Sequence, residues 1–452
     1  MKDPQKNNTH YRRHLSSFQI IIMGFAIAIL IGSLLLMLPV STVDRQGASF
    51  EDSLFTATSA LCVTGLVVQD TATYWSVFGQ AVIISLIQVG GLGIITLAMA
   101  ITTISGKKIG IMQRNTMQEA ISAPNMAGIV RLTGFILKVT ICTELICAAI
   151  MFPVFFREFG LGKGLWYSIF HSISAFCNAG FDLMGVKGHF SSLTSFVGQP
   201  VINITIMFLI VFGGIGFLTW EDLRRNKWHF RKYRLQTKVI FCVTAILIIL
   251  PALWMYFYEY AGQTSMTQGE RVLASFFQSV TLRTAGFNTT DLTAVSEPGQ
   301  ALMTLLMLIG GSPGSTAGGM KTTTIAVLIS CAISVFRRRE DTQLFNRRAN
   351  TDTVKNAATI FLMYMFLFFF SGMAISAIEK LPLLQCLFES ASAVGTVGLT
   401  LGITPGLSTV SHVILIILMY LGRVGGLTLV FAAVSNRYKT HSQYPQEEIT
   451  VG

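Results

Sequence analysis

The chain has 452 residues, of which 52% are hydrophobic and only 12% are charged. Its mean hydropathy is +0.60, whereas an average protein carries about 25% charged residues. This composition excludes a soluble enzyme, and the length suits about eight membrane helices of roughly 20 residues each. The seven cysteines lie in or beside apolar stretches without CxxC or metal-ligand spacing, which excludes a secreted disulfide scaffold.

Long apolar runs alternate with shorter half-polar segments along the chain. The first run is too long for the core of a signal peptide, so we interpret it as a retained helix. The half-polar segments are too short to span and end in glycine, which favours re-entrant helices over the alternative of extracellular turns. The runs are 18–40, 75–104, 132–156, 199–220, 238–258, 299–336, 356–378 and 408–434, and the half-polar segments are 50–61, 164–176, 270–282 and 383–394.

The half-polar segments are copies of one another when aligned on four glycines. These are Gly65, Gly180, Gly286 and Gly398, and a phenylalanine lies ten residues before each: Phe55, Phe170, Phe276 and Phe388. A serine lies six residues before three of them (Ser59, Ser174 and Ser392), whereas the third copy has Val280. Such a period of about 110 residues indicates an internal repeat whose unit is helix, re-entrant helix, glycine loop and helix.

This repeat predicts an all-α membrane protein with eight spans. Because each unit contains two spans, the four units are parallel and surround a pseudo-fourfold central pore, unlike the inverted repeats of many transporters. The predicted divisions are an amino end 1–17, units 18–104, 132–221, 238–336 and 356–434, connections 105–131, 222–237 and 337–355, and a tail 435–452. Most of the 33 basic residues lie in the ends and the connections, which places both termini in the cytoplasm.

The glycine loops have no carboxylate, histidine or consistent hydroxyl in common. Their sequences are Cys62-Val63-Thr64-Gly65, Cys177-Asn178-Ala179-Gly180, Arg283-Thr284-Ala285-Gly286 and Gly395-Thr396-Val397-Gly398. The groups they share are backbone carbonyls and a glycine that permits unusual backbone angles. Rings of carbonyls can replace the hydration shell of a potassium-sized cation, so the loops predict an ion-selectivity filter.

A glycine cluster recurs in the second span of each unit, which is typical of close helix packing in the first two units. In the third unit the cluster interrupts a run, 299–336, that is too long for one span. We expect this interruption to form an intramembrane gate, with a linker between two interfacial helices as the alternative. The predicted gate residues are Gly310, Gly311, Ser312, Pro313, Gly314, Ser315, Thr316, Ala317, Gly318, Gly319, Lys321 and Arg423.

Four charged residues at membrane depth need partners. Gly422, the residue before Arg423, lies as far beyond its filter glycine as Gly310 does, so we expect Arg423 to bind carbonyls of the gate, with snorkelling to the interface as the alternative. Arg283 is a cation beside a cation filter, and we expect its head group to turn outward or bind a carboxylate. Lys138 and Glu144 are assigned a structural polar contact.

The four loops, the segment Gly310–Thr322 and Arg423 resemble the Trk/Ktr/HKT superfamily of potassium transporters, and within it the bacterial Ktr-type membrane subunit. The resemblance covers residues 10–452. It implies potassium uptake at a bacterial cell membrane, often sodium-dependent, by a homodimer with one pore per subunit. It also implies a cytosolic ring of regulatory subunits, which alone bind nucleotide. Plant relatives that favour sodium have serine at the position of Gly65, so its glycine implies potassium.

Two other classes fit less well. A coupled transporter of a small organic solute needs intramembrane charges around a solute-sized cavity, and only Arg423 and Lys321 qualify. A membrane-embedded enzyme needs a constellation of histidine and acidic residues, but the histidines are scattered. Nucleic-acid binding is excluded because no aromatic-basic module accompanies the positive charge; membrane lipid is the expected surrounding.

Overall fold

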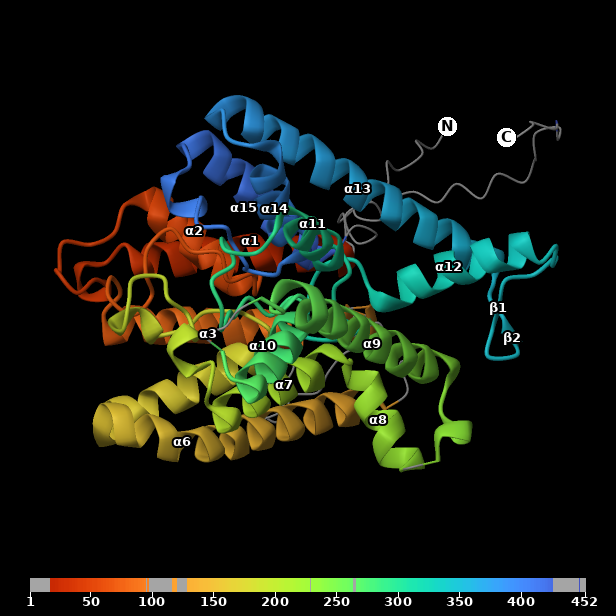
Figure 1. Ribbon diagram of the computed structural model, residues 1–452, viewed down its shortest axis with the longest axis horizontal. Coiled ribbons are helices and arrows are strands. Elements are labelled where there is room, and N and C mark those ends of the chain that lie inside the picture. Colours follow the sequence, from red (N-terminus) through yellow and green to blue (C-terminus); the bar gives the residue numbers. More distant parts are fainter. Residues whose placement is uncertain are drawn as a thin grey trace, which may run out of the picture.

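The computed structural model describes residues 17–94, 96, 116–119, 128–227, 229–262, 266–425 and 447. Most of the predicted amino end, of the first connection and of the carboxyl tail lies outside these residues, as does the end of the fourth unit. The described chain is mostly helical, as expected from its composition (Figure 1). Its paired strands are β1 (Gln343–Leu344) and β2 (Arg347–Arg348), which form a short antiparallel hairpin.

The helices are grouped here by the predicted unit into which most of their residues fall. The first unit contains α1 (Ser17–Leu36), α2 (Phe50–Leu61) and α3 (Val77–Leu92); the second contains α6 (Ile129–Phe176), α7 (Pro200–Gly214) and α8 (Phe217–Asn226). The third contains α9 (Leu235–Trp254), a π-helical turn Met255–Glu259, α10 (Gln268–Thr281), α11 (Glu297–Met307) and α12 (Thr322–Phe336). The fourth contains α13 (Thr351–Glu379), α14 (Leu383–Gly395) and α15 (Thr409–Val424). Of these helices, α6, α8, α9 and α13 extend past the predicted bounds. Short 3-10 turns occupy Pro39–Ser41, Met184–Val186, Thr194–Phe196, Phe230–Lys232 and Thr404–Gly406.

Side-chain caps set where several of these helices begin. Ser49 accepts a hydrogen bond from an amide of the first turn of α2, and Ser76 and Ser296 do the same for α3 and α11. Thr267 and Glu270 form a reciprocal capping box at the start of α10. Such caps satisfy amides that have no partner within the helix, so these short helices begin at defined residues.

The first helix of each unit is long and apolar enough to cross a membrane. The spans found among the described residues are Gln19–Leu36, Ile129–Phe176, Leu235–Glu259 and Thr351–Glu379. The second helices are shorter or bent: α7 and α8 pass the same test only as a pair bent by 94°, and α3, α12 and α15 are apolar but short. The structure therefore supports a multi-pass protein with four full-length helices, or five if the bent pair is counted as one.

Several predicted runs are not continuous helices. The runs 75–104, 199–220 and 408–434 break at Gly93, Gly216 and Gly425, whose φ angles of 85°, 94° and 87° lie in the left-handed region. Glycine adopts this region without the steric cost that a Cβ brings, so the glycine clusters interrupt helices as well as packing closely. The predicted segments 132–156 and 164–176 carry the single label α6, but non-helical backbone at Gly160, which lies between them, divides it into two helices as expected.

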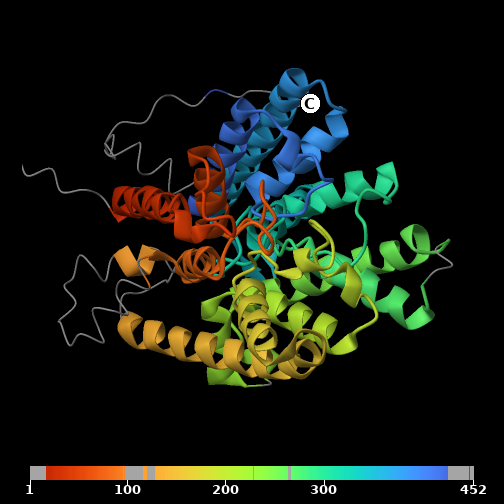
Figure 2. The same cartoon turned by 90° about the vertical axis from the view of Figure 1, so that its left-hand side faces the viewer.

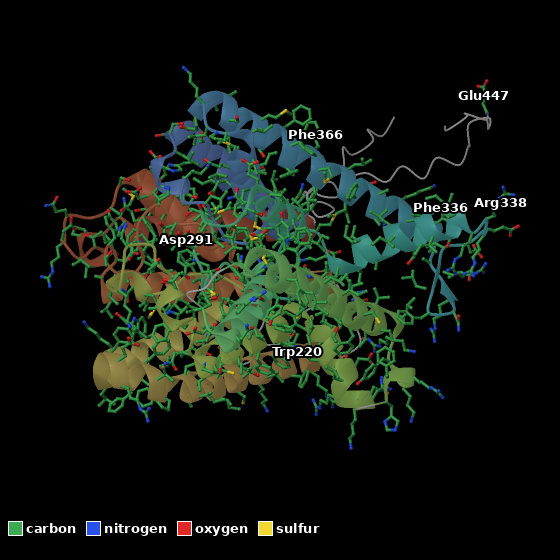
Figure 3. The ribbon with its side chains drawn as sticks, viewed as in Figure 1. Trp220, Asp291, Phe336, Arg338, Phe366 and Glu447 are labelled. Carbon is green, nitrogen blue, oxygen red and sulfur yellow. The ribbon has the colours of Figure 1, made fainter. Side chains whose placement is uncertain are left out.

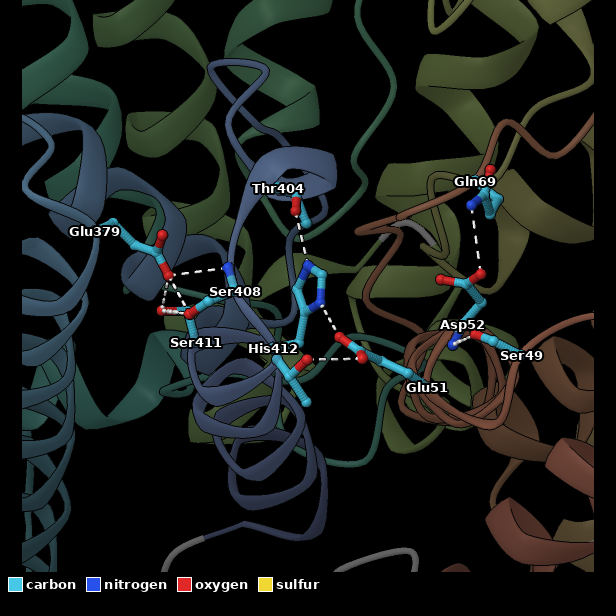
Figure 4. Close-up of polar contacts among 10 residues, drawn as sticks. Ser49, Glu51, Asp52, Gln69, Glu379, Thr404, Ser408, Ser411 and His412 are labelled. Carbon is cyan, nitrogen blue, oxygen red and sulfur yellow. Dashed lines mark hydrogen bonds and ion pairs between the residues drawn. The ribbon is translucent and has the colours of Figure 1, made fainter.

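The fourth unit packs back onto the first, although the two are far apart in sequence (Figures 1 and 2). At one end of α15, the Nδ1 atom of His412 lies 2.7 Å from a carboxylate oxygen of Glu51 on α2, and Nε2 lies 2.9 Å from the Thr404 carbonyl (Figure 4). Glu379, at the end of α13, accepts hydrogen bonds from Ser408 and Ser411. The His412–Glu51 contact therefore joins the fourth unit to the first and completes a ring of units, whereas the Glu379 contacts hold the fourth unit together.

Candidate functional site

The four glycines of the repeat lie side by side at the centre of this ring. A Cβ atom built on Gly180 would lie 2.8 Å from the Gly286 Cα, and one on Gly398 would lie 2.9 Å from the Gly65 Cα. Gly286 in turn adjoins Gly398, and Gly65 adjoins Gly180. Each glycine therefore touches its neighbours in the order of the units, and any side chain there would collide with the backbone of the next loop.

The four loops also share an unusual backbone. Each has a left-handed φ at the glycine (93°, 69°, 82° and 91°) and another two residues earlier, at Val63, Asn178, Thr284 and Thr396 (58°, 61°, 62° and 51°). A left-handed φ is rare outside glycine and costs about 1–3 kcal/mol for each residue held there. Three of these residues are β-branched, for which the cost is greatest. Four repetitions of one strained pattern indicate that the surrounding structure imposes it.

Hydroxyl groups on the short helices hold the loops in this shape. The Gly65 amide donates to the Ser59 hydroxyl at 3.1 Å, and the Gly398 amide donates to the Ser392 hydroxyl at 3.0 Å. The Ser174 hydroxyl donates instead to the Phe181 carbonyl at 2.7 Å. The serine column noted in the sequence is therefore the set of side chains that fixes the loops.

The third copy is offset by one residue. Phe55, Phe170 and Phe388 are fully buried, but Phe276 is 40% exposed and Phe277 takes the buried place. The hydroxyl that Val280 lacks is supplied by Thr281, which donates to the Phe287 carbonyl at 2.5 Å. The alignment of Phe276 with the other three phenylalanines is therefore wrong, because the buried phenylalanine of the third copy, Phe277, lies one residue closer to its glycine.

Carbonyl groups and helix ends are the chemistry that the ring can offer. Four helices end at or next to the loops: α2, α6, α10 and α14. A helix carboxyl end carries partial negative charge, so four such ends converge near the ring. The side chains of the loops differ between units, and the described residues contain no group of three or more histidine, cysteine or acidic residues able to hold a metal ion. This arrangement can stabilise a monovalent cation through backbone oxygens.

A cavity of about 220 Å³ opens on one side of the ring. All four glycines line it, together with the carboxylates of Asp70, Asp182 and Asp291. Burial raises the pKa of the Asp182 carboxyl, which lies in the loop after Gly180, to about 6, although the amide of Met184 partly offsets this. Asp291 is an exposed residue, labelled in the left half of the molecule in Figure 3. Carboxylates at this mouth attract cations toward the ring.

The segment 310–319, between α11 and α12, lies on the other side of the ring. Gly310 adjoins the Thr284 side chain and Gly318 adjoins the Thr396 hydroxyl, so the segment touches the third and fourth loops directly. A second cavity, of about 280 Å³, is lined by this segment together with α3 and α15. The segment therefore separates the glycine ring from the second cavity.

The segment is held more firmly than its glycine content indicates. The Ser312 amide donates to the Gly214 carbonyl at 2.9 Å, and the Gly314 carbonyl accepts from the Phe217 amide at 2.7 Å. Most of its residues are buried. Although the segment has little side-chain bulk, its backbone fits closely against the surrounding helices.

Arg423 and Lys321 are the cations of this region. The Arg423 guanidinium donates to the Thr316 carbonyl of the segment and also to the carbonyls of Gly90 and Gly91 on α3. The Lys321 ammonium donates to the carbonyls of Ala317 and Gly318 at 2.7 and 3.2 Å. Both cations therefore bind backbone oxygens near the predicted gate, and Arg423 joins three units.

Two other expectations about charged residues are wrong. Arg283 is 5% exposed, and its Nε and Nη2 atoms have no partner, so it neither turns outward nor binds a carboxylate through them. Lys138 is exposed and makes no ion pair with Glu144. Glu144 instead accepts from the Gln88 side chain at 3.2 Å, because α3 rather than the next turn of α6 supplies its neighbour.

The fold is that of a mostly helical protein with several apolar helices long enough to cross a membrane, and its four glycine loops adjoin one another. A model of the TrkH family, described as cation transport protein, matches residues 3–441. The chain belongs to this family.

Its relatives match it over nearly their whole length. The chain is 40% identical to the Ktr system potassium uptake protein B of Bacillus subtilis, covering 96% of each chain. It is 39% identical to the potassium/sodium uptake protein NtpJ of Enterococcus hirae, covering 98% of each. Among solved structures, the potassium transporter TrkH from Vibrio parahaemolyticus has the same fold. It superposes with a TM-score of 0.73 at 20% identity, covering 95% of this chain and 86% of that one.

Proposed function

We propose that this protein is the potassium-translocating membrane subunit of a Ktr-type uptake system. The observation that carries the proposal is the ring of four adjoining glycines, each in the same strained backbone, into which four helix carboxyl ends converge. The relatives from Bacillus subtilis and Enterococcus hirae, a potassium uptake protein and a potassium/sodium uptake protein, agree with it.

Residues 62–65, 177–180, 283–286 and 395–398 are the selectivity filter in this proposal. Their carbonyls replace the water around a dehydrated potassium ion. The strained residues Val63, Asn178, Thr284 and Thr396 keep the neighbouring carbonyls from turning away, and the ion reaches the filter from the cavity that Asp70 and Asp182 line.

The segment 310–319, with Lys321 and Arg423, is the gate. It lies under the filter, and its anchors reach α7, α8 and α15. It opens when these contacts give way to an alternative arrangement. The contact between Arg423 and the Thr316 carbonyl favours the closed state.

The remaining parts of the proposal concern assembly and topology. Eight spans in four parallel units place both termini in the cytoplasm of a bacterial cell, and two copies form a homodimer with one pore each. A cytosolic nucleotide-binding ring docks at the cytoplasmic face and acts on the gate through α12. Phe336 and Arg338, at the end of α12, lie far from the core in Figure 3 and suit such a contact. Sodium is the candidate second ion.

Transport of potassium by the purified chain tests this function. Vesicles that contain the chain should take up potassium down its gradient, with weaker uptake of sodium, and the chain should restore growth at low potassium to a cell without potassium uptake. The main alternative, a coupled transporter of a small organic solute, predicts neither result. Equal passage of all monovalent cations would also contradict a potassium filter.

A further inference from the structure

Asn178 differs from the other three strained loop residues in what its side chain binds. Val63, Thr284 and Thr396 have aliphatic or hydroxyl side chains, and the hydroxyls of Thr284 and Thr396 have no hydrogen-bond partner. The buried amide of Asn178 instead donates from Nδ2 to the Arg283 carbonyl of the third loop, at 3.2 Å. One filter loop is therefore hydrogen-bonded to the next through a side chain.

The other end of the same amide faces the segment 310–319. The Thr316 hydroxyl lies 3.2 Å from Asn178 Oδ1 and 3.1 Å from the Phe176 carbonyl, and it can donate to either. The Nδ2 atom is committed to the Arg283 carbonyl, so the amide orientation follows from the hydrogen-bond network. The backbone carbonyl of Thr316 is also the acceptor for Arg423.

Close packing leaves this contact no freedom to shift. A Cβ atom on Gly213 would lie 2.9 Å from the Thr316 hydroxyl and 3.0 Å from Asn178 Oδ1. Asn178 and Thr316 are both almost completely buried, at 1% and 0% exposure. A buried group that loses its hydrogen-bond partner costs more free energy than one at a surface. Displacing Thr316 would leave Asn178 Oδ1 without its donor and so favour a different position of the Asn178 amide.

We propose that Asn178 is a positioning residue through which the segment 310–319 sets the geometry of the filter. While the segment is in place, the Thr316 hydroxyl fixes the Asn178 amide of the second loop. That amide in turn fixes the Arg283 carbonyl of the third loop. When the segment moves, Asn178 Oδ1 loses the hydroxyl that donates to it, and the carbonyl ring loosens. The gate state thus adjusts potassium selection as well as flux. This inference rests on the proposed function.

The test is a comparison of selection with flux in vesicles that contain the chain. Thr316→Val removes the hydroxyl at nearly constant volume and touches no loop carbonyl. We expect the sodium concentration that halves potassium uptake to fall by about three- to tenfold, the change in an equilibrium that one hydrogen bond of ordinary net strength brings. Thr316→Ser keeps the hydroxyl and should restore parental selection.

Two further variants separate this role from a merely structural one. Asn178→Ala should relax selection at least as much as Thr316→Val, and the double variant should relax it no further than Asn178→Ala alone, because both remove the same link. Thr304→Val is the matched control. The buried Thr304 hydroxyl donates to the Gln300 carbonyl within α11 at 2.7 Å and bonds neither to the segment 310–319 nor to a filter loop, so both flux and selection should stay parental.

The inference is overturned if Thr316→Val alters flux but leaves selection at the parental value, or if the two substitutions add fully. If Asn178→Ala does not insert, Thr316→Val and Thr316→Ser alone decide the question. Gly65→Ser in the same assay reports on the filter itself. If Gly65→Ser relaxes selection and Thr316→Val does not, the filter stands and only the coupling fails. If Gly65→Ser has no effect, the proposed function fails first.

Discussion

Replacing Arg423 by alanine tests how the gate is held. The guanidinium donates to one carbonyl of the segment, that of Thr316, and to two carbonyls of α3. A hydrogen bond from a charged group contributes about 1.5–3 kcal/mol, and only the Thr316 bond links Arg423 to the segment. If this bond exists only in the closed state, the substitution raises the open fraction by roughly ten- to a hundredfold, as long as the closed state is the more populated one.

The assay is potassium flux into vesicles without the regulatory partner, at equal amounts of folded chain. Arg423→Lys keeps the charge but lacks the forked donors, so it should fall between the parent and Arg423→Ala. Because Arg423 also joins α3 to α15, thermal unfolding of each variant is the control for loss of fold. Flux through folded Arg423→Ala that does not exceed the parental flux would refute the view that this contact holds the gate closed.

The remaining predictions concern the segment, the outer cavity and the topology. Deleting Gly314–Gly318 removes the carbonyls that Phe217, Lys321 and Arg423 bind, so flux should rise more than in Arg423→Ala with potassium still preferred; an unchanged flux would make the segment a linker. Potassium uptake at low ion concentration should fall as the external pH drops through about 6, where the Asp182 carboxyl becomes protonated and neutral. The variant Asp182→Asn should have low uptake at every pH, without this step. An identical pH step in that variant would rule out Asp182 as its origin. A cysteine in place of the exposed Arg225, in a background without Cys142, Cys242 and Cys331, should react with an impermeant thiol reagent only in inverted vesicles, and labelling of intact cells would contradict cytoplasmic connections.

The repeat itself could be predicted from the sequence because its signal is local. A glycine at a fixed distance from an aromatic residue and a serine requires no knowledge of packing, and α2 begins and ends at the predicted residues. The predicted spans that failed did so at Gly93, Gly216 and Gly425, where hydropathy continues across a backbone break. Hydropathy measures transfer to lipid and carries no information about φ.

Contacts between units could not be predicted in the same way. The strained φ of Val63 and Thr396 contradicts their own preferences, so only the assembled ring accounts for it. The role of Thr281 depends on the one-residue offset of the third copy. The role of Asn178 depends on Arg283, which lies more than a hundred positions away in the sequence. The sequence places Arg423 near the segment 310–319 only through the equal spacing of the two from their filter glycines. No local pattern predicts its hydrogen bonds to Gly90 and Gly91.

The central claim is that a dehydrated potassium ion sits among the four glycine loops, and its most direct test is anomalous X-ray diffraction from crystals in which rubidium replaces potassium. The account predicts a rubidium peak on the axis of the ring, surrounded by carbonyls of residues 62–65, 177–180, 283–286 and 395–398, which weakens when sodium replaces rubidium. A well-ordered ring without a peak, with rubidium bound only elsewhere in the protein, would contradict it.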